Sequence, residues 1–468
     1  MAQEQAKFLE GSLMGHITVM ALTASVGLMA IFLVDLVDMI FISMLGKEEL
    51  AAAVGYAGAI LFFTSSFGIG MSIAAGALVA RALGEGQVRM ASRRAATAML
   101  YGVGFGAIFA ALVWVNIPAL AALMGAQGAT LDLAVGYLRI IIPSLPLLII
   151  GMVGGAILRA HGDARRAMIA TIAAGVVNAV LDPIFIFGFG LELTGAAMAS
   201  VASRVAIAFA ALYPIFRWHG GLEKPSATEF RVDFPAIMTI ALPAILTQFA
   251  TPLGQAYVTR SMAQFGADAV AGMAIISRLV PVAFGVIFAL SGAIGPIIGQ
   301  NFGAGRHDRV RGALRDGLVF TLAVTVLVSA LLFIARGPIA DLFGATGLTR
   351  ELVFLFCGPL ALAWFFNGVI FLSNAAFNNL GHPFYSTWIN WGRHTLGTIP
   401  FVIVGAAWWQ GPGVLIGQAL GGAVFAAVAL VLAAKVMRDK AAGVEPEIEA
   451  PHPYARQTRQ ITLFNLRR

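Results

Sequence analysis

The chain has 468 residues, of which 59% are hydrophobic and only 11% are charged. Soluble domains contain about 45–50% apolar and about 25% charged residues, so this composition excludes an ordinary soluble enzyme or binding module and predicts a membrane protein. The single cysteine, Cys357, excludes an internal disulfide.

The amino-terminal residues MAQEQAKFLEGS are polar and include two glutamates, unlike a cleaved signal peptide, so the first apolar stretch is expected to remain in the protein. Crossing the hydrocarbon core takes about 20 apolar residues, and a helix satisfies its own backbone hydrogen bonds there. Twelve such stretches follow one another at 17–44, 50–80, 95–117, 131–158, 166–189, 194–216, 235–262, 268–300, 312–335, 351–377, 384–407 and 412–434. The sequence therefore predicts an all-α polytopic membrane protein with twelve transmembrane helices.

The basic residues divide unevenly between the two sides of these spans. With the amino terminus in the cytoplasm, 22 of the 30 lysines and arginines fall on the cytoplasmic side, five lie within spans, and only Lys47, Arg336 and Arg350 lie outside. Cytoplasmic loops are enriched in Lys and Arg, so both termini are predicted to be cytoplasmic. The same bias, with attraction to anionic lipid, accounts for the net charge of +7 without a nucleic-acid partner.

The two halves of the chain repeat each other at an offset near 219 residues. ARALGEGQVRMAS at 80–92 aligns with GQNFGAGRHDRVR at 299–311, and other glycines recur at this spacing: Gly46 with Gly266, Gly162 with Gly381, and Gly195 with Gly413. Six spans per half give both halves the same orientation, so two parallel-related six-helix bundles are expected around a central cleft. The predicted parts are an N-lobe (1–216), a cytoplasmic linker (217–233), a C-lobe (234–434) and a cytoplasmic tail (435–468).

Only three of the 23 acidic residues, Asp35, Asp38 and Asp182, lie deep within apolar spans. A charged side chain at the bilayer centre costs about 2.5–3.5 kcal/mol on insertion scales, so such residues point to function. Asp35 and Asp38 share one face of the first span, and Asn178 and Asp182 share one face of the fifth. Two helices thus present a set of carboxylates and an amide that could hold a cation.

Pro183 and Ser200 stand beside this set. Pro183 follows Asp182 directly and removes a backbone donor, which could free carbonyl oxygens for a cation, and Ser200 on the sixth span offers a hydroxyl. Pro183 and Ser200 also have structural explanations, because a proline can curve a helix and a serine can allow close helix packing. Asn178 could equally make an ordinary hydrogen bond between helices.

The aspartates also have a structural explanation, since Asp35 or Asp38 could pair with Arg204 or Arg139. The repeat favours a functional one, because the second half has uncharged residues at the positions equivalent to Asp35 and Asp38, namely Gln255 and Val258. A purely structural requirement would be expected in both halves.

Four segments together resemble the multidrug and toxic-compound extrusion (MATE) family: VDLVDMIFISMLGKEELAAAVGYA, VARALGEGQ, ILRAHGDARRAM and NAVLDPIFIFGFGLELTGAAMASV. The resemblance extends over residues 15 to 435 and is strongest to the DinF-like branch. It implies that Asp38, Asn178 and Asp182 form a cation-responsive cluster and would be the ligands of Na⁺ if Na⁺ is the coupling ion. Ser200 falls where this branch usually has Thr, and Asp35 where Asn is more usual.

Two departures from the family pattern concern helix bending and cation sites. Thr23 stands where family members often have a proline in the first helix, whereas the paired seventh helix keeps Pro243. Thr23, Pro183 and Pro243 are therefore the positions expected to govern conformational change. No acid lies between Asp233 and Asp268 or between Glu351 and Asp439, so no cation site is expected in the C-lobe.

The resemblance implies an antiporter of the bacterial inner membrane that exports amphipathic, often cationic, drugs by alternating access in exchange for H⁺ or Na⁺. It implies a monomer in contact with lipid and small molecules, no cofactor beyond the coupling ion, and a substrate site between the lobes lined by Met and aromatic side chains. A flippase for lipid-linked oligosaccharide precursors, from the same superfamily, remains an alternative. An intramembrane enzyme holding Mg²⁺ at Asp35 and Asp38 would need a second acid-rich motif, which the sequence lacks.

Overall fold

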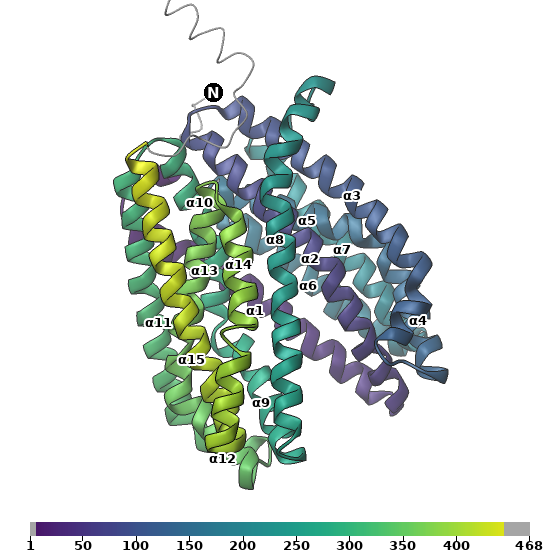
Figure 1. Cartoon of the computed structure of the whole chain (residues 1–468). Helices are drawn as coiled ribbons and strands as arrows, with labels where there is room; N and C mark the ends of the chain where they lie inside the picture. The colour runs from purple at the N-terminus through teal and green to yellow at the C-terminus, as the bar shows by residue number, and fades with distance from the viewer. Residues whose placement is uncertain (1–5, 444–468) are drawn as a thin grey trace, which may run out of the picture.

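The computed structural model describes residues 6–443, which form helices joined by short loops and contain no strand (Figure 1). The first half forms η1 (Lys7–Leu9), α1 (Leu13–Met44), α2 (Glu48–Gly84), α3 (Val88–Leu123), α4 (Gly128–Ile141), η2 (Ile142–Ser144), α5 (Leu145–Ala160), α6 (Ala164–Pro183), η3 (Ile184–Gly188) and α7 (Glu192–Trp218). The second half forms α8 (Ala227–Ala263), α9 (Ala267–Ala283), α10 (Gly285–Gly303), α11 (His307–Leu342), α12 (Gly347–Leu355), η4 (Phe356–Leu360), α13 (Trp364–Asn379), α14 (Pro383–His394) and α15 (Ile399–Ala441).

Twelve membrane spans are present in the described part of the chain. Ten helical stretches are long and apolar enough to cross a membrane, and α12 and η4 with α13, bent by 58°, make an eleventh. The longest stretch, Pro383–Ala441, contains two spans, because Trp409 and Gln410 interrupt α15 with non-helical backbone angles. The two parts lie against each other so closely that a Cβ on Gly421 would stand 1.3 Å from the carbonyl oxygen of Gly397. The prediction of twelve transmembrane helices is confirmed.

Helix occupies part of the predicted linker (217–233) and extends beyond the predicted end of the C-lobe at residue 434. The connection between the lobes is a loop only over 219–226, because Ser226 and Glu229 form a capping box that starts α8 at Ala227. Asx, Ser and Thr caps of this kind satisfy the first free backbone N–H groups of a helix. At the other end of the C-lobe α15 continues to Ala441, and the predicted tail beyond residue 443 lies outside the described residues.

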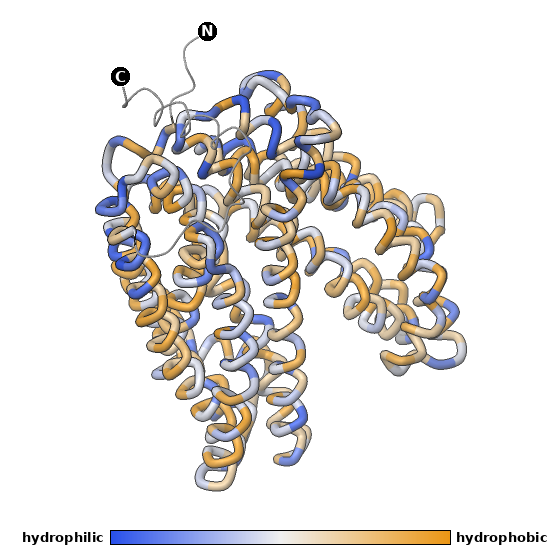
Figure 2. Tube along the Cα trace, turned by 45° about the horizontal axis from the view of Figure 1, so that its top comes forward, coloured by the Kyte–Doolittle hydropathy of each residue, from blue (hydrophilic) through white to orange (hydrophobic). Residues whose placement is uncertain are grey.

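The loops that follow the second, fourth, sixth, eighth and tenth spans lie with η1 at one end of the bundle, here called the basic end. The two lobes meet at this end and diverge toward the opposite end (Figure 1). Hydrophobic residues run along the helices, while hydrophilic residues gather at the basic end and at helix tips (Figure 2). This distribution fits a bundle whose sides face lipid.

Glycines of the sequence repeat seal the lobes together at the basic end. A Cβ on Gly84 of α2 would lie 2.0 Å from the carbonyl oxygen of Gln300, and one on Gly303 of α10 would lie 2.2 Å from that of Arg81. Only glycine allows backbones to approach this closely. Because Gly84 and Gly303 occupy equivalent positions in the two halves, α2 and α10 make the same contact from opposite sides.

The amino-terminal segment bridges both lobes at the basic end. Lys7 donates to the carbonyl oxygen of Gly162 in the N-lobe at 3.0 Å. In the C-lobe, Gln300 accepts from the Phe8 backbone at 2.9 Å, and Arg309 donates to the Phe8 carbonyl at 3.0 Å. The Phe8 side chain is buried. The segment before α1 therefore adds to the contact that closes this end.

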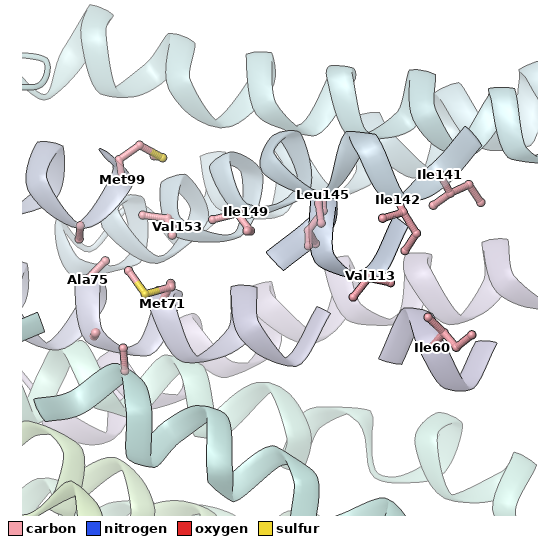
Figure 3. Packing of buried hydrophobic residues seen from close by; sticks show 14 of the residues in the cluster. Ile60, Met71, Ala75, Met99, Val113, Ile141, Ile142, Leu145, Ile149 and Val153 are labelled. Carbon is pink, nitrogen blue, oxygen red and sulfur yellow. The ribbon is translucent and has the colours of Figure 1, made fainter. Parts of the chain in front are cut away.

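The N-lobe core is built from α2, α3 and α5 (Figure 3). Met71 and Ala75 of α2 face Ile149 and Val153 of α5, and Gly106 of α3 leaves room for Ile149, whose Cδ1 would lie 2.2 Å from an added Cβ. Close packing of small and branched side chains replaces the hydrophobic driving force that lipid does not supply.

Candidate functional site

Asp38, Asn178 and Asp182 lie together between α1 and α6. The Asn178 amide nitrogen donates to both carboxylate oxygens of Asp38, at 3.1 and 3.2 Å, and to Oδ2 of Asp182 at 2.9 Å. Asn178 and Asp182 come from successive turns of α6, so their side chains point the same way. The structure thus brings together the three residues that the sequence singled out on two separate spans.

The two carboxyl groups of this cluster are close enough to interact directly. Both accept hydrogen bonds from the same Asn178 nitrogen, which brings the carboxyl groups of Asp38 and Asp182 together, and neither can donate to the other when both are ionised. Asp182 is fully buried, and its Oδ1 atom accepts no hydrogen bond from any residue between 6 and 443. A buried carboxylate oxygen without a donor is unstable, so this position calls for a proton or a cation.

Pro183 ends α6 immediately after the cluster. The next five residues, Ile184–Gly188, form the π-helical turn η3, in which the Phe189 N–H bonds to the Ile184 carbonyl at 2.9 Å. Proline cannot donate to the preceding turn, and wide turns of this kind follow such an interruption. α6 therefore gives way to a wider turn directly beside the cluster.

Asp35 and Ser200 lie near the cluster but outside its hydrogen bonds. Asp35 is one turn from Asp38 on α1, and its side chain is exposed. Ser200 of α7 makes no hydrogen bond to the carboxyl groups of the cluster within the described residues.

The pairing of an aspartate with Arg204 does not occur. Arg204 donates to the Ile141 carbonyl oxygen and to Ser144, both at 3.0 Å. Arg139 likewise forms no ion pair within the described residues, and its backbone carbonyl accepts from Trp114. The acids are therefore not neutralised by the arginines that could have explained them structurally.

Thr23 and Pro243, the other two positions expected to govern conformational change, differ in their surroundings. α1 passes through Thr23 as one unbroken helix. In α8 the Pro243 carbonyl oxygen accepts hydrogen bonds from the hydroxyls of Thr247 and Thr387, both at 2.8 Å. The hydrogen bond from Thr387 therefore connects α8 to α14 at this proline.

A cavity of about 930 Å³ lies between the lobes, lined by α1, α2, α5 and α6 on one side and by α8, α10, α13 and α14 on the other. Its lining reaches Ala77 on α2 and Pro296 on α10. One turn further toward the basic end, a Cβ on Gly299 would stand 2.9 Å from that of Ala80, so the cavity has a floor there. Asp35, Asp38, Asn178 and Asp182 are not among the lining residues.

Met and aromatic residues line the cavity, as the resemblance implied, but so do charged groups that the sequence did not assign to a site. These are Arg159 at the end of α5 and Arg393 with His394 at the end of α14. Arg159 directly follows the predicted span 131–158, so from the sequence it is one of the basic residues on the cytoplasmic side. Arg393 sits in NWGRHTLGT, the least apolar stretch of the eleventh span, and that polarity is the signal that could have found it.

A family model described as MatE matches residues 24–184 and 243–404, which include most of both lobes. The chain belongs to the MatE family. As a MatE protein it is a transporter and not an enzyme, and it is a multi-pass membrane protein.

Two curated relatives and one solved structure illustrate the similarity. The FAD transporter of Shewanella oneidensis is 33% identical over 395 residues, which are 83% of this chain and 87% of the relative. The multidrug export protein MepA of Staphylococcus aureus is 24% identical over 360 residues, 75% of this chain and 78% of that protein. The outward-facing structure of a multidrug resistance MATE family transporter matches with a TM-score of 0.86 at 22% identity, covering 92% of this chain and 98% of the other.

Proposed function

We propose that this MatE protein is a cation-coupled exporter whose coupling ion binds at Asp38, Asn178 and Asp182. The observation that carries the proposal is the carboxyl pair between α1 and α6, with one buried oxygen of Asp182 lacking a hydrogen-bond donor. Two ionised carboxylates this close repel each other, and a bound cation removes the repulsion. The C-lobe position equivalent to Asp38 is the buried, apolar Val258, so the proposed ion site belongs to the N-lobe alone.

α1 is the element that can pass ion binding to the lobe interface. Its second half carries Asp38 against α6, whereas its first half contributes Ile17 and Met20 to the same buried cluster as Leu290 of α10. Ion binding stabilises the contact of α1 with α6 and thereby biases how the two lobes pack. A ligand shifts a conformational equilibrium only through such a difference in affinity between two states.

The proposed orientation places the basic end, with both termini, in the cytoplasm of a bacterial cell. The floor of the cavity then separates bound cargo from the cytoplasm, and the structure represents the state that releases cargo outside. Return to the inward-facing state requires α2 and α10 to separate at Gly84 and Gly303.

The proton is the coupling ion that the cluster suits best as it is arranged. The nitrogen of the Asn178 amide faces both carboxyl groups, and a shared proton completes the set of hydrogen bonds. Na⁺ prefers oxygen ligands, so the amide would have to turn over to offer its oxygen. Within the described residues no three His, Cys, Asp or Glu side chains are grouped to hold a metal.

The proposed cargo is an amphipathic organic molecule bound in the central cavity. The relatives name two classes, FAD and multidrug substrates, and both fit the size range of about 300–1,000 Å³ typical of ligand pockets. A flippase of lipid-linked precursors would use a similar cleft, but it would carry a lipid tail through the gap between the lobes.

The test uses purified protein in proteoliposomes with FAD and ethidium as separate probes. Asp38→Asn and Asp182→Asn keep side-chain size and remove the ionisable group, so each is expected to reduce gradient-driven export of the transported probe to background. Asp35→Asn, on the same helix but outside the hydrogen-bonded cluster, is the matched control and is expected to lose much less. Parental export rates in the Asp38 and Asp182 variants would refute the assignment.

The coupling ion is tested by imposing a pH gradient in Na⁺-free buffer and a Na⁺ gradient at equal pH. Export driven by the pH gradient alone is expected. Export that requires Na⁺ would replace the proton with Na⁺ at the same three residues.

A further inference from the structure

We infer that the central cavity binds an organic anion of dinucleotide size, with its phosphate groups held by Arg159 and Arg393 and its ring system held by the aromatic wall of the C-lobe. The inference rests on the proposed function and names the class of its cargo.

Arg393 is held at a break in a membrane span. α14 ends at His394, α15 begins at Ile399, and the Thr398 hydroxyl bonds to the Arg393 carbonyl oxygen across the break at 2.9 Å. Discontinuous helices of this kind commonly mark the binding site of a transporter. The Arg393 guanidinium donates to the amide oxygen of Asn367, and no carboxylate among the described residues pairs with it. Its remaining donors are available to a ligand.

Arg159 reaches from the N-lobe toward the C-lobe. Positions without side chains surround its guanidinium, since a Cβ on Gly155 would lie 3.4 Å from Nη1 and one on Gly292 of α10 would lie 3.9 Å from Nε. Within residues 6–443 this guanidinium has no hydrogen-bond acceptor or ion-pair partner. A guanidinium that faces the cavity without an acceptor of its own can bind an anionic ligand through charge-assisted hydrogen bonds.

The rest of the lining strengthens the positive charge of the two arginines. Among the described residues that line the cavity there is no Asp or Glu, so an organic cation would lose its hydration beside two positive charges and gain no counter-charge. His394 is 6% exposed, and neither ring nitrogen has a hydrogen-bond partner within the described chain. Asn374 likewise presents an unpaired buried oxygen. These polar atoms are covered by neighbouring atoms, so the two arginines are the groups that can contact a charged ligand.

An aromatic wall lies on the C-lobe side of the same cavity. Phe288, Trp364 and Phe371 all line it, with ring centroids 5.5 Å apart for Phe288 and Trp364 and 5.6 Å apart for Phe288 and Phe371. Planar ring systems such as nucleotide bases stack on aromatic side chains, and this stacking depends little on which substituents the ring carries. Arginines and aromatic rings together suit a molecule that is planar at one end and phosphorylated at the other.

A phosphate ester on an amphipathic group can come from two sources, a soluble nucleotide or a polyprenyl pyrophosphate lipid. The cavity favours the soluble nucleotide because a flat ring matches the aromatic wall, whereas an isoprenoid chain does not. Both sources are therefore included in the experiment.

The experiment measures equilibrium binding to purified protein in nanodiscs without any ion gradient, so its result is independent of the coupling proposal. Riboflavin, FMN and FAD share one ring system and differ in phosphate, and their fluorescence reports binding directly. The parent protein is expected to bind FAD at least ten-fold more tightly than riboflavin and to bind ethidium more weakly than either.

Arg159→Gln and Arg393→Gln are each expected to weaken FAD binding about ten-fold or more, since each removes a charge-assisted hydrogen bond, and to change riboflavin affinity less than two-fold. Arg393→Lys keeps the charge and is expected to recover part of the loss. Arg139→Gln makes the same charge change in a span, away from the cavity, and is the matched control. Thermal unfolding of each variant checks that it is folded.

Three results would overturn the inference: equal affinity of the parent protein for FAD and riboflavin, FAD binding unaffected by both arginine substitutions, or ethidium binding tighter than FAD. Competition of FAD by a polyprenyl pyrophosphate at lower concentration than by unlabelled ADP would assign the arginines to a lipid headgroup and would overturn the choice of a soluble nucleotide. The parental comparison alone is decisive if an arginine variant fails to fold.

Discussion

Gly84→Ala is expected to shift the protein away from the conformation that is closed at the basic end. The added Cβ would stand 2.0 Å from the carbonyl oxygen of Gln300 and 2.7 Å from its carbonyl carbon, both of them backbone atoms. Neither can rotate away as a flexible side chain could. α2 and α10 must therefore separate before the methyl group fits.

The size of the shift follows from overpacking in other well-packed interiors. Inserting a methyl group into such a contact costs about 1–3 kcal/mol, and it costs this only in the state in which α2 touches α10. Alanine also raises helix propensity by about 1 kcal/mol, but this gain is common to both states and cancels. At about 1.36 kcal/mol per tenfold, the ratio of closed to open basic ends is expected to fall by roughly 5- to 150-fold.

Double electron–electron resonance between labels on the two lobe tips measures this ratio. Gln127 before α4 and Thr346 before α12 are exposed and lie at the end opposite the basic end. Cys357, the only native cysteine, is buried and is replaced by serine. A shorter distance population between the tips is expected to grow in Gly84→Ala.

Gly104→Ala is the matched control, because it makes the same change in α3 where a Cβ meets nothing within 4 Å. Gly303→Ala is expected to act like Gly84→Ala, and the double variant is expected to add little, because one methyl group already separates the helices. Identical distance distributions for Gly84→Ala and Gly104→Ala would refute the reasoning that these glycines seal the cavity.

Two further predictions concern ion pairs at the basic end. Arg93 of α3 donates two hydrogen bonds of 3.1 Å to Asp233 of α8, and both residues are buried. Removing one partner of a buried ion pair typically costs about 3–5 kcal/mol of stability. Asp233→Ala is therefore expected to lower the unfolding temperature clearly. Glu223→Ala breaks a pair with the exposed Arg89 and is expected to change stability by about 0–1 kcal/mol. Equal effects of the two substitutions would contradict the expectation that the buried pair stabilises the protein more than the exposed one. Burial alone would raise the pKa of Asp163, but hydrogen bonds from His219 and Arg166 outweigh it and hold that pKa well below its usual range. A depressed folded-state pKa means that the stabilisation is complete above the unfolded value of about 3.9 and is lost at lower pH. The difference in unfolding temperature between the parent and Asp163→Asn is thus expected to be present at pH 5 and to shrink between pH 4 and pH 2, and a difference that grows on acidification would contradict this.

The spans and the paired lobes could be predicted because lipid imposes its requirements locally along the sequence. A span must be apolar over its whole length, and glycines such as Gly84 and Gly303 recur because both lobes use the same close helix contact. Asp38 and Asp182 were recognisable for the complementary reason that lipid excludes unpaired acids. Hydrophobic length, however, does not show how helices pack, so the sequence could not indicate that α1 belongs to the cores of both lobes.

The cavity arginines could not be identified in the same way. Arg159 ends a span, where basic residues normally lie at the membrane surface. Only the packing of the two lobes against each other closes the cavity at the basic end and leaves Arg159 in the cavity lining. Arg393 was visible as a charge within a span, but its partner could have been any acid on a neighbouring helix. The finding that Asn367 is its sole hydrogen-bond partner among described residues required the packing of α13 against α14.

The separation of acids from arginines has an energetic consequence for the proposed exporter. Moving one charge through 100 mV is worth about 2.3 kcal/mol, so export of a dianion from a cell with a negative interior gains about 4.6 kcal/mol before any coupling, and inward movement of one proton adds a further 2.3. Export of a monovalent cation would instead lose about 2.3 kcal/mol and cancel the electrical contribution of that proton. Acids in the cavity would neutralise its arginines and weaken anion binding. A coupling site between α1 and α6 and a cargo site between the lobes let both charges move in the direction that the membrane potential favours.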